Sequence, residues 1–293
     1  MEEITYRVLA LDLDGTLTNS QKQVTPATRE ALKRAAQAGV KIVLASGRPV
    51  MGIRPLADQL RLDRLDGYIL AANGAQVVSC QSGEAIYTSA VPQDAIAQME
   101  VIARQYGVAL LCYDRRGVIS DRPDDPYVRR EAFNNSLTIS YEPHMARRVT
   151  WPAPKLMMVG DPQTLAPCAR YAQQYFGDRL SVFLSERYFL ELAAPGISKS
   201  SGLKKLLDHL GESREALMAM GDGLNDLDML SFAGLGVAMK NACPEAKAAA
   251  GALTASNDED GVAEAVYRYI LKESFAAAKR QLFPAPDSAV RLA

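Results

Sequence analysis

The sequence lacks the features that mark membrane, secreted and nucleic-acid-binding proteins. No run of about 18 uninterrupted apolar residues occurs, which argues against a membrane-spanning helix. The first residues, MEEITYR, carry acids where a secretory signal would carry bases. Lys plus Arg (33) nearly cancels Asp plus Glu (34), so the net charge of −1 gives no pull toward polyanions. We therefore expect a cytoplasmic protein with no nucleic-acid or membrane partner.

The residues that most often hold transition metals are also scarce. The 293 residues include four cysteines and two histidines. Cys80, Cys112, Cys168 and Cys243 lie far apart, with no C-x-x-C pair and no neighbouring His, which argues against a zinc site. We expect reduced, structural thiols. With 48% apolar and 23% charged residues, the chain has ordinary globular composition and enough length for two domains.

The segment from Val8 to Thr18 reads VLALDLDGTLT. Its apolar start predicts a short buried strand that carries Asp12 and Asp14 at its C-terminal end. Because side chains on a strand repeat every second residue, the two carboxylates start on the same face, roughly 7 Å apart. Gly15 then lets the chain turn at once. Two like charges this close cost about 4 kcal/mol at an intermediate dielectric, so the pair calls for a cation or a shared proton.

Strands and helices alternate in the residues that follow. Thr25-Pro26 predicts the start of a helix that runs to about Ala38, and KIVLAS (Lys41 to Ser46) predicts a second buried strand. A helix around Met51 to Gln59 and a strand from Tyr68 to Ala72 repeat the pattern. Strand, helix, strand indicates parallel units with right-handed crossovers. We therefore expect an α/β fold with a doubly wound, parallel, Rossmann-like sheet as its core.

From about Gly83 the pattern changes to short alternating strands. They are interleaved with helical stretches at Gln93 to Tyr106 and Leu165 to Phe176, which indicates an inserted α+β domain. We predict a catalytic core of residues 1–82 and 189–282, an inserted cap of residues 83–188 and a C-terminal tail of residues 283–293. A helix from Gly261 to about Leu282 is expected to close the core.

Reactive polar groups follow several of the predicted strands. Ser46 ends the second strand, and LMAMGDG (Leu217 to Gly223) ends near Asp222, Asn225 and Asp226. Since ligands of open parallel sheets bind off the carboxyl ends of the strands, these segments can converge there. Lys199, at a helix start, would add one positive charge. Excess carboxylates without His or Cys ligands suit Mg²⁺.

Each of these residues alone has a plainer interpretation. An Asp after a buried strand is more often a cap or an ion-pair partner, Ser46 alone is a common helix N-cap, and Lys199 alone is a common surface lysine. Their joint occurrence, each at a strand end or helix start, favours a site.

Four segments resemble the sequence motifs of the haloacid dehalogenase superfamily: LDLDGTLT, ASGR, ISK and GDGLNDLDML. Their order and the insertion between the second and third are similar to the Cof-type phosphatase branch, which has a large α/β cap. ANGAQV and NDEDGVAEAV extend the likeness over nearly the whole chain. The branch usually has Gly after the motif lysine, where this chain has Ser200.

The resemblance implies a role for each matching residue. Asp12 would be the nucleophile that forms an aspartyl-phosphate, and Asp14 the general acid and base. Asp222 would bind Mg²⁺ together with Asp12 and the backbone carbonyl of Asp14. The remaining roles are phosphoryl binding by Ser46, the Gly47 amide, the catalytic Lys199 and Asn225, with Asp226 orienting the lysine.

The activity that this resemblance implies is Mg²⁺-dependent hydrolysis of small phosphorylated metabolites, by a monomer or a homodimer. Sugar phosphates come first as substrates, and phosphorylated cofactors such as pyridoxal phosphate or a flavin mononucleotide second. A phosphomutase or phosphotransferase, which passes the phosphoryl group to an alcohol, stays open, because sequence does not separate water from an alcohol as acceptor. A sensor that binds a phosphorylated ligand without turnover is less favoured, since a sensor needs no acid and base beside a nucleophile.

Several further polar residues have two interpretations. Arg48 could steer a phosphate or pair with a core carboxylate. Five residues of the predicted cap could recognise substrate, although a solvated face and hairpin is the favoured interpretation: Tyr113, Arg115, Arg116, Arg122 and Tyr127.

Overall fold

The computed structural model describes residues 5–282. By its contacts the chain divides into two compact units, Met1–Ile42 with Ser213–Ala293, and Val43–Glu212. Strand β2 (Lys41–Ala45) begins in the first unit and ends in the second. The predicted division into core and cap places its boundaries elsewhere and stays a prediction.

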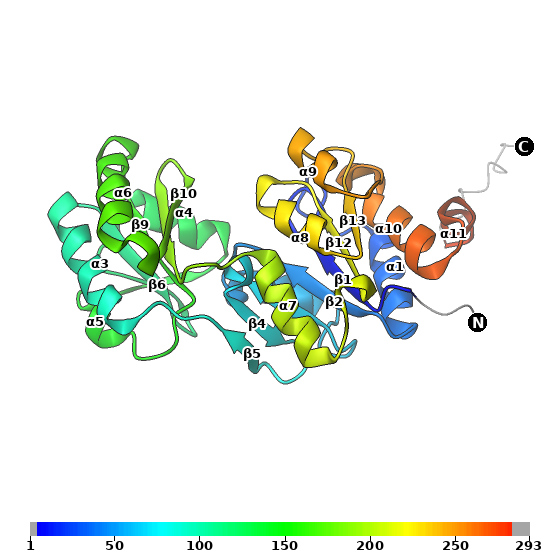
Figure 1. Ribbon diagram of the computed structural model, residues 1–293, viewed down its shortest axis with the longest axis horizontal. Helices are drawn as coiled ribbons and strands as arrows, with labels where there is room; N and C mark the ends of the chain where they lie inside the picture. The colour runs from blue at the N-terminus through cyan, green and yellow to red at the C-terminus, as the bar shows by residue number, and fades with distance from the viewer. Residues whose placement is uncertain (1–4, 283–293) are drawn as a thin grey trace, which may run out of the picture. The chain divides into compact units, whose positions relative to one another are not determined.

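The first unit is built on parallel strands in the order β14-β13-β12-β1. Every residue of β1 and β12 is buried, because helices cover a parallel sheet on both faces. Figure 1 shows α8 beside β12 and β13, and α10 beside α1. The strands are β1 (Val8–Leu11), β12 (Leu217–Gly221), β13 (Leu235–Ala238) and β14 (Ala252–Leu253). The helices are α1 (Pro26–Gln37), α8 (Leu227–Phe232), α9 (Pro244–Ala249), α10 (Gly261–Ala265) and α11 (Phe275–Leu282), with short turns η3 (Arg214–Ala216), η4 (Leu224–Asp226), η5 (Asn257–Glu259) and η6 (Val266–Leu271).

Helix α1 begins as the sequence predicts, whereas the last predicted helix is broken. Thr25 caps α1 by accepting a hydrogen bond from the Thr28 amide. The continuous helix predicted from Gly261 to Leu282 is wrong: α10 passes into the π-helical turn η6, and Lys272 then adopts a left-handed conformation (φ 56°). An L-residue in this conformation ends a right-handed helix. The Glu273 side chain pairs with Arg34 of α1 at 2.7 Å and fixes the break.

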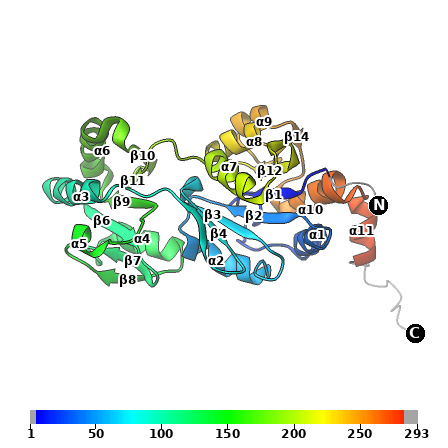
Figure 2. The same ribbon diagram turned by 60° about the horizontal axis from the view of Figure 1, so that its bottom comes forward.

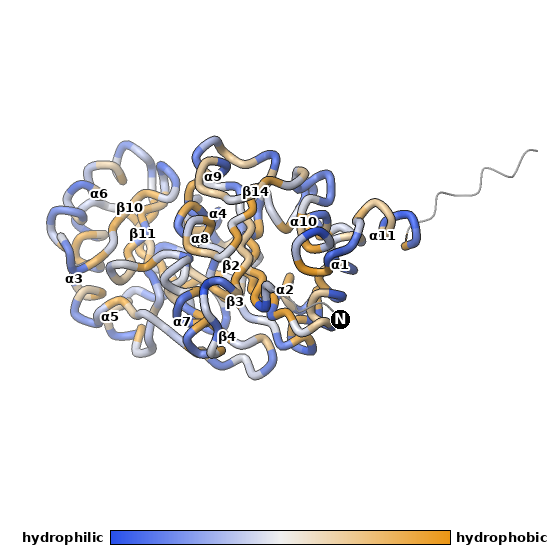
Figure 3. The backbone as a smooth tube through the Cα atoms, turned by 45° about the vertical axis from the view of Figure 1, so that its right-hand side comes forward, coloured by the Kyte–Doolittle hydropathy of each residue, from blue (hydrophilic) through white to orange (hydrophobic). Residues whose placement is uncertain are grey.

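Two sets of strands make up the second unit, and the first set continues from β2 in the order β2-β3-β4-β5. β3 (Tyr68–Ala71) is parallel to β2, while β4 (Gln76–Ser79) and β5 (Ala85–Thr88) are antiparallel to their neighbours. In Figure 3 the tube is hydrophobic along β2 and β3, which agrees with their burial. The helices packed with this set are α2 (Val50–Gln59), η1 (Ala72–Gly74) and α7 (Lys199–Leu210).

The other set is a six-stranded sheet in the order β10-β11-β9-β6-β7-β8, and Figure 2 shows β6, β7 and β8 side by side. Alternate residues of β6 face opposite sides: Leu110 packs with α3 and α6, and Leu111 packs with α4. The strands are β6 (Ala109–Tyr113), β7 (Gly117–Ser120), β8 (Thr138–Tyr141), β9 (Lys155–Val159), β10 (Ser181–Glu186) and β11 (Phe189–Ala193). The helices are α3 (Gln93–Tyr106), α4 (Pro126–Asn134), α5 (Met145–Arg148), α6 (Pro162–Phe176) and the turn η2 (Gly177–Arg179).

The polar stretch after β6 contains more structure than the sequence predicted. β6 and β7 form an antiparallel hairpin, which agrees with the hairpin interpretation of these residues. Helix α4 was not predicted, although Asp125 caps it by accepting from the Tyr127 amide and Pro126 occupies its first turn. An Asp-Pro pair is a recognisable helix start, so this signal was available. Within residues 5–282 no helix has both the length and the apolar character to cross a membrane.

Candidate active site

Three carboxylates converge at the ends of two neighbouring strands of the first unit. Asp12 directly follows β1 and Asp222 directly follows β12, and the two strands are parallel neighbours. Asp226 completes the group, since one oxygen from each of the three side chains lies within 4.8 Å of the others. Asp12 is 7% exposed and Asp226 is fully buried. The structure thus brings together residues separated by about two hundred positions, as the strand-end argument predicts.

Asp226 also shapes the turn that carries Asp222. Its Oδ2 accepts hydrogen bonds from the Asp222 amide (3.0 Å) and the Gly223 amide (2.9 Å). A carboxylate that accepts two backbone donors fixes the local backbone. This hold on the turn was not predicted, and the orientation of Lys199 by Asp226 stays a prediction. Asn225, in the same turn, is exposed, and its phosphoryl contact also stays a prediction.

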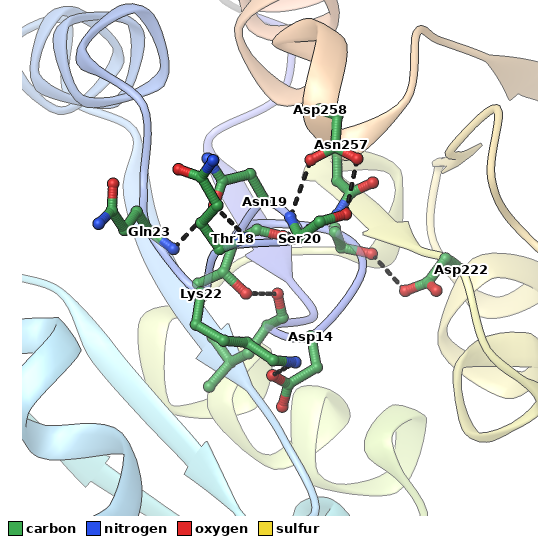
Figure 4. A network of polar contacts seen from close by, with 12 residues as sticks. Asp14, Thr18, Asn19, Ser20, Lys22, Gln23, Asp222, Asn257 and Asp258 are labelled. Atoms are coloured by element: carbon green, nitrogen blue, oxygen red, sulfur yellow. Dashed lines mark hydrogen bonds and ion pairs between the residues drawn. The ribbon is translucent and has the colours of Figure 1, made fainter.

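The loop after β1 holds the Asp222 carboxylate from the other side. Thr16 Oγ1 donates to Asp222 Oδ1 at 2.8 Å (Figure 4). Gly15 has φ +87°, and a Cβ at this residue would lie 2.3 Å from Asp222 Oδ2. Glycine is therefore needed here both for the left-handed backbone and for the close approach of the carboxylate. The sequence indicated the turn but not this contact.

Polar side chains from the C-terminal part of the first unit fasten the same loop. Asn241 Nδ2 donates to the Gly15 carbonyl at 2.8 Å, and Asn257 Nδ2 donates to the Thr18 carbonyl at 2.9 Å. Asp258 accepts from both the amide and the hydroxyl of Ser20 (Figure 4). No local sequence pattern joins these residues to the loop, although NDED belongs to a segment that resembles the family. They position the loop that carries Asp12 and Asp14.

The Asp14 side chain is in contact with a lysine of the same loop. Lys22 Nζ lies 2.7 Å from Asp14 Oδ1, and the two side chains are 66% and 39% exposed (Figure 4). An exposed pair of this kind contributes at most about 1 kcal/mol to stability. Asp14 is not one of the three converging carboxylates. The metal contact predicted for its backbone carbonyl stays a prediction.

The cluster of three carboxylates fits a hard divalent cation. Its donors are oxygens from Asp12, Asp222 and Asp226, and neither His nor Cys contributes to it. Mg²⁺ prefers carboxylate, carbonyl and water oxygens, whereas Zn²⁺ and copper prefer nitrogen and sulfur. The negative charges of three carboxylates this close together repel one another, and a bound cation would relieve this repulsion.

In the second unit, Ser46 and Gly47 follow β2 and are fastened to the end of β3. The Ser46 carbonyl accepts from the Asn73 amide at 3.0 Å, and Ser46 Oγ accepts from the Arg48 amide at 3.2 Å. Asn73 has φ 53°, and its carboxamide lies beside Gly47. Asn73 Oδ1 is buried without a hydrogen-bond partner among the residues that the structure describes. Because a buried polar atom rarely stays unsatisfied, this oxygen is a candidate for contact with a ligand or a water molecule.

Lys199 is placed at the same end of these strands by its helix. It is the first residue of α7, is 1% exposed, and follows the N-cap Ser198. Gly74 and Gly202 let this helix approach the turn η1, since a Cβ at Gly202 would lie 2.7 Å from the Gly74 Cα. Ser200 fits within a regular helix start, where Ser198 and Ser201 form a capping box. A lysine this deeply buried is not a solvated surface residue.

A second buried polar cluster, which the sequence did not predict, lies on the α4 face of the six-stranded sheet. Lys155 Nζ lies 3.0 Å from Glu191 Oε2, and the Tyr113 hydroxyl donates to Glu131 Oε1 at 2.7 Å. Asn135 Nδ2 donates to the same Glu131 oxygen at 2.8 Å. Burial raises the pKa of Glu131, although Lys155 and these hydrogen bonds favour its ionised form.

A pocket of about 660 Å³ in the second unit adjoins this cluster. The pocket is lined at the start of α2 by Pro49, Val50 and Met51. Arg148 and Trp151 also line it, and the Arg148 guanidinium lies 5.3 Å from the centre of the Trp151 indole. Of the five residues of the predicted cap that have two interpretations, Tyr113, Arg115 and Arg116 line this pocket. Arg122 instead donates to the Gly107 carbonyl, and Tyr127 stacks on Tyr188.

Comparison with known proteins agrees with the motifs. The chain is 42% identical to a haloacid dehalogenase-like hydrolase from Bacteroides thetaiotaomicron, whose crystal structure superposes with a TM-score of 0.86 over 90% of this chain and 99% of that chain. It is 27% identical to the pyridoxal phosphate phosphatase YbhA of Escherichia coli (strain K12), over 92% of this chain and 100% of that protein. The subclass IIB sugar phosphatase BT4131 is 26% identical and superposes with a TM-score of 0.73 over 90% of this chain and 98% of that chain. A family model for haloacid dehalogenase-like hydrolases matches residues 9–266, and the chain belongs to this family of α/β hydrolases, which includes phosphatases.

Proposed function

We propose that the protein is a Mg²⁺-dependent phosphatase that hydrolyses phosphate monoesters of small metabolites through an aspartyl-phosphate on Asp12. The observation that carries this proposal is the convergence of Asp12, Asp222 and Asp226 at the ends of β1 and β12. The chain belongs to the haloacid dehalogenase-like family, and these residues lie in the segments LDLDGTLT and GDGLNDLDML, which resemble its first and fourth sequence motifs.

Asp12, Asp222 and the backbone carbonyl of Asp14 would hold the metal, and Asp226 offers a further oxygen nearby. When bound, Mg²⁺ would supply positive charge against the phosphoryl oxygens and against the carboxylates themselves.

Asp12 and Asp14 would take part in two successive displacements at phosphorus. In the first, an oxygen of Asp12 forms a bond to phosphorus while the ester P–O bond breaks, and Asp14 gives its proton to the leaving alkoxide. In the second, Asp14 takes a proton from water as the water oxygen bonds to phosphorus. The bond between Asp12 and phosphorus then breaks, which releases inorganic phosphate and restores the Asp12 carboxylate.

The residues of the second unit would bind the phosphoryl oxygens. Ser46 Oγ, the Gly47 amide and the Lys199 ammonium are the donors that the family resemblance assigns, with Asn225 as a further contact. The burial of Lys199 supports this role, because a desolvated ammonium interacts strongly with an anion. Uncatalysed phosphate-monoester hydrolysis is so slow that these groups together must lower the barrier by roughly 20 kcal/mol or more.

Sugar phosphates and phosphorylated cofactors are the substrate classes that we propose. Two similar proteins support these classes, the sugar phosphatase BT4131 and the pyridoxal phosphate phosphatase YbhA, which are 26% and 27% identical to this chain. The pocket beside Trp151 and Tyr113 is large enough for a sugar or a pyridine ring, and Arg115 and Arg116 give it a cationic rim. The monomeric or homodimeric state, the cytoplasmic location and the absence of nucleic-acid and membrane partners stay predictions.

A phosphate-release assay tests the proposal. The purified protein would be incubated with hexose phosphates, pyridoxal phosphate and flavin mononucleotide, with Mg²⁺ or with excess chelator and without any alcohol acceptor. We expect phosphate release that needs the metal. Release only after an alcohol is added would favour a phosphotransferase, and no release from any ester would favour a sensor.

A further inference from the structure

The contact that leads to the inference joins the six-stranded sheet to the loop after β2. Lys155, the first residue of β9, places its Nζ 3.0 Å from Glu191 Oε2 and 3.1 Å from the carbonyl oxygen of Gly47. Lys155 is 4% exposed and Glu191 is 7% exposed. Burying a lysine and a glutamate costs several kcal/mol per ion, so the pair contributes little net stability compared with apolar residues of similar size.

The same cluster touches the loop and the helix that follows it at a second point. A Cβ at Gly52 in α2 would lie 2.4 Å from Asn135 Oδ1, so the carboxamide packs directly on the helix backbone. Asn135 in turn donates to Glu131, which accepts from Tyr113, and Lys155 Nζ lies 5.9 Å from the centre of the Tyr113 ring. The network therefore holds segment 47–52 at both ends.

Gly47 lies outside a helix, unlike Gly52 in α2, so helical hydrogen bonds do not hold its backbone. Without a Cβ, a glycine samples more backbone conformations than other residues, and the rotation of its carbonyl is limited chiefly by what that carbonyl contacts. Its amide is one of the donors assigned to the phosphoryl group, and Ser46 precedes it directly. Donors stabilise a transition state best when they are already oriented before the reaction.

We infer that Lys155, held by Glu191, is a positioning residue that orients the Ser46–Gly47 donors for phosphoryl transfer by fixing the Gly47 carbonyl. The inference rests on the proposed function. Because Lys155 also lines the pocket, it could instead bind the leaving group of the substrate. The two roles predict different effects. A positioning residue affects every ester alike, whereas a leaving-group contact affects only the esters that reach it.

The test compares Lys155→Met with the double variant Lys155→Met/Glu191→Leu. Methionine keeps the length of the side chain without a donor, and the second substitution removes the buried carboxylate that would otherwise lose its partner. Lys204→Met, on the exposed side of α7, is the matched control. Circular dichroism melts would establish that the variants fold, and kcat and KM would be measured with p-nitrophenyl phosphate and pyridoxal phosphate.

We expect kcat to fall about 100-fold with both esters in the folded double variant, a loss typical of removing one oriented donor. We expect KM to change by less than about threefold, because the ground-state contacts remain. An unchanged kcat in the folded double variant would overturn the inference, and so would a loss confined to pyridoxal phosphate. Failure of the proposed function would show differently, as wild-type protein that releases no phosphate, and it would end this inference as well.

Discussion

Two buried polar clusters, one around Asp12 and Asp222 and one around Lys155 and Glu191, use charge in opposite ways. In the first unit, Asp12, Asp222 and Asp226 bring three carboxylate oxygens within 4.8 Å of one another. In the second unit, Lys155 and Glu191 pair opposite charges at 3.0 Å. The first arrangement concentrates one sign of charge and favours a bound cation, whereas the second pairs opposite charges and fixes its neighbours. Burial of charge alone does not mark a binding site, and the pattern of signs is the more informative feature.

The largest effect should follow from changing one acid of the first cluster. In Asp12→Asn the amide is a far weaker nucleophile, so we expect kcat to fall by about 10⁴-fold or more. The fold should persist, with a melting temperature within a few degrees of the wild type (~1 kcal/mol). Stopped assays of phosphate release and thermal melts would measure both. Full activity in this variant would rule out covalent catalysis at Asp12.

Changing an acid of the second cluster should instead lower the stability of the fold. Glu191→Leu leaves the Lys155 ammonium buried without its carboxylate, so we expect unfolding to become easier by about 3–5 kcal/mol. Chemical denaturation would measure this change. Recovery of most of the loss in Lys155→Met/Glu191→Leu would identify the unpaired charge as its cause, and an equal loss in the double variant would instead indicate lost packing.

A pair of glycines separates backbone strain from damage to the carboxylates. Gly15 and Gly39 both have positive φ, but only Gly15 has a neighbour, Asp222, within 4 Å of an added Cβ. We expect Gly39→Ala to lower the free energy of unfolding by about 1 kcal/mol. Gly15→Ala should lower it further, and it should also raise the Mg²⁺ concentration needed for half-maximal activity. Equal effects of the two variants on metal dependence would contradict the contact with Asp222.

The smallest effect at neutral pH concerns the cysteines. Burial raises the pKa of Cys112 to about 12 and the pKa values of Cys80 and Cys168 to about 11. Near pH 7.5 these thiols should resist iodoacetamide, and the half-buried Cys243 should react first, as peptide mass spectrometry would detect. Since these pKa values are raised above the unfolded value of about 8.5, stability should fall as pH rises from about 8.5 toward 11. Rapid alkylation of Cys112 in folded protein would contradict its burial.

Much of the first cluster could be predicted, because its residues directly follow segments that the sequence identifies as buried strands. Asp12 and Asp222 each follow a fully buried run, and parallel neighbours end at the same edge of a sheet. The contacts that hold them could not be predicted. Thr16 bonds to Asp222 across 206 residues and Asn241 to Gly15 across 226, and no local pattern links such pairs.

The second cluster was missed for a different reason. A lysine at the start of a strand and a glutamate within another one normally indicate a solvent-facing side, so Lys155 and Glu191 carry no sequence signal of burial. They come together as diagonal neighbours, because β9 and β11 pair antiparallel in a register that sets Lys155 opposite Ala193 and Glu191 opposite Met157. The break at Lys272 was missed likewise, since neither Gly nor Pro marks it.

Isothermal titration with Mg²⁺ in the absence of substrate tests the central claim most directly. Wild-type protein would be compared with Asp222→Asn and with Asp178→Asn, an exposed control in η2. The account predicts one binding site in the wild type and the control, and at least about tenfold weaker binding in Asp222→Asn, because a neutral amide is a poorer ligand than a carboxylate. Equal affinity in all three proteins would contradict it.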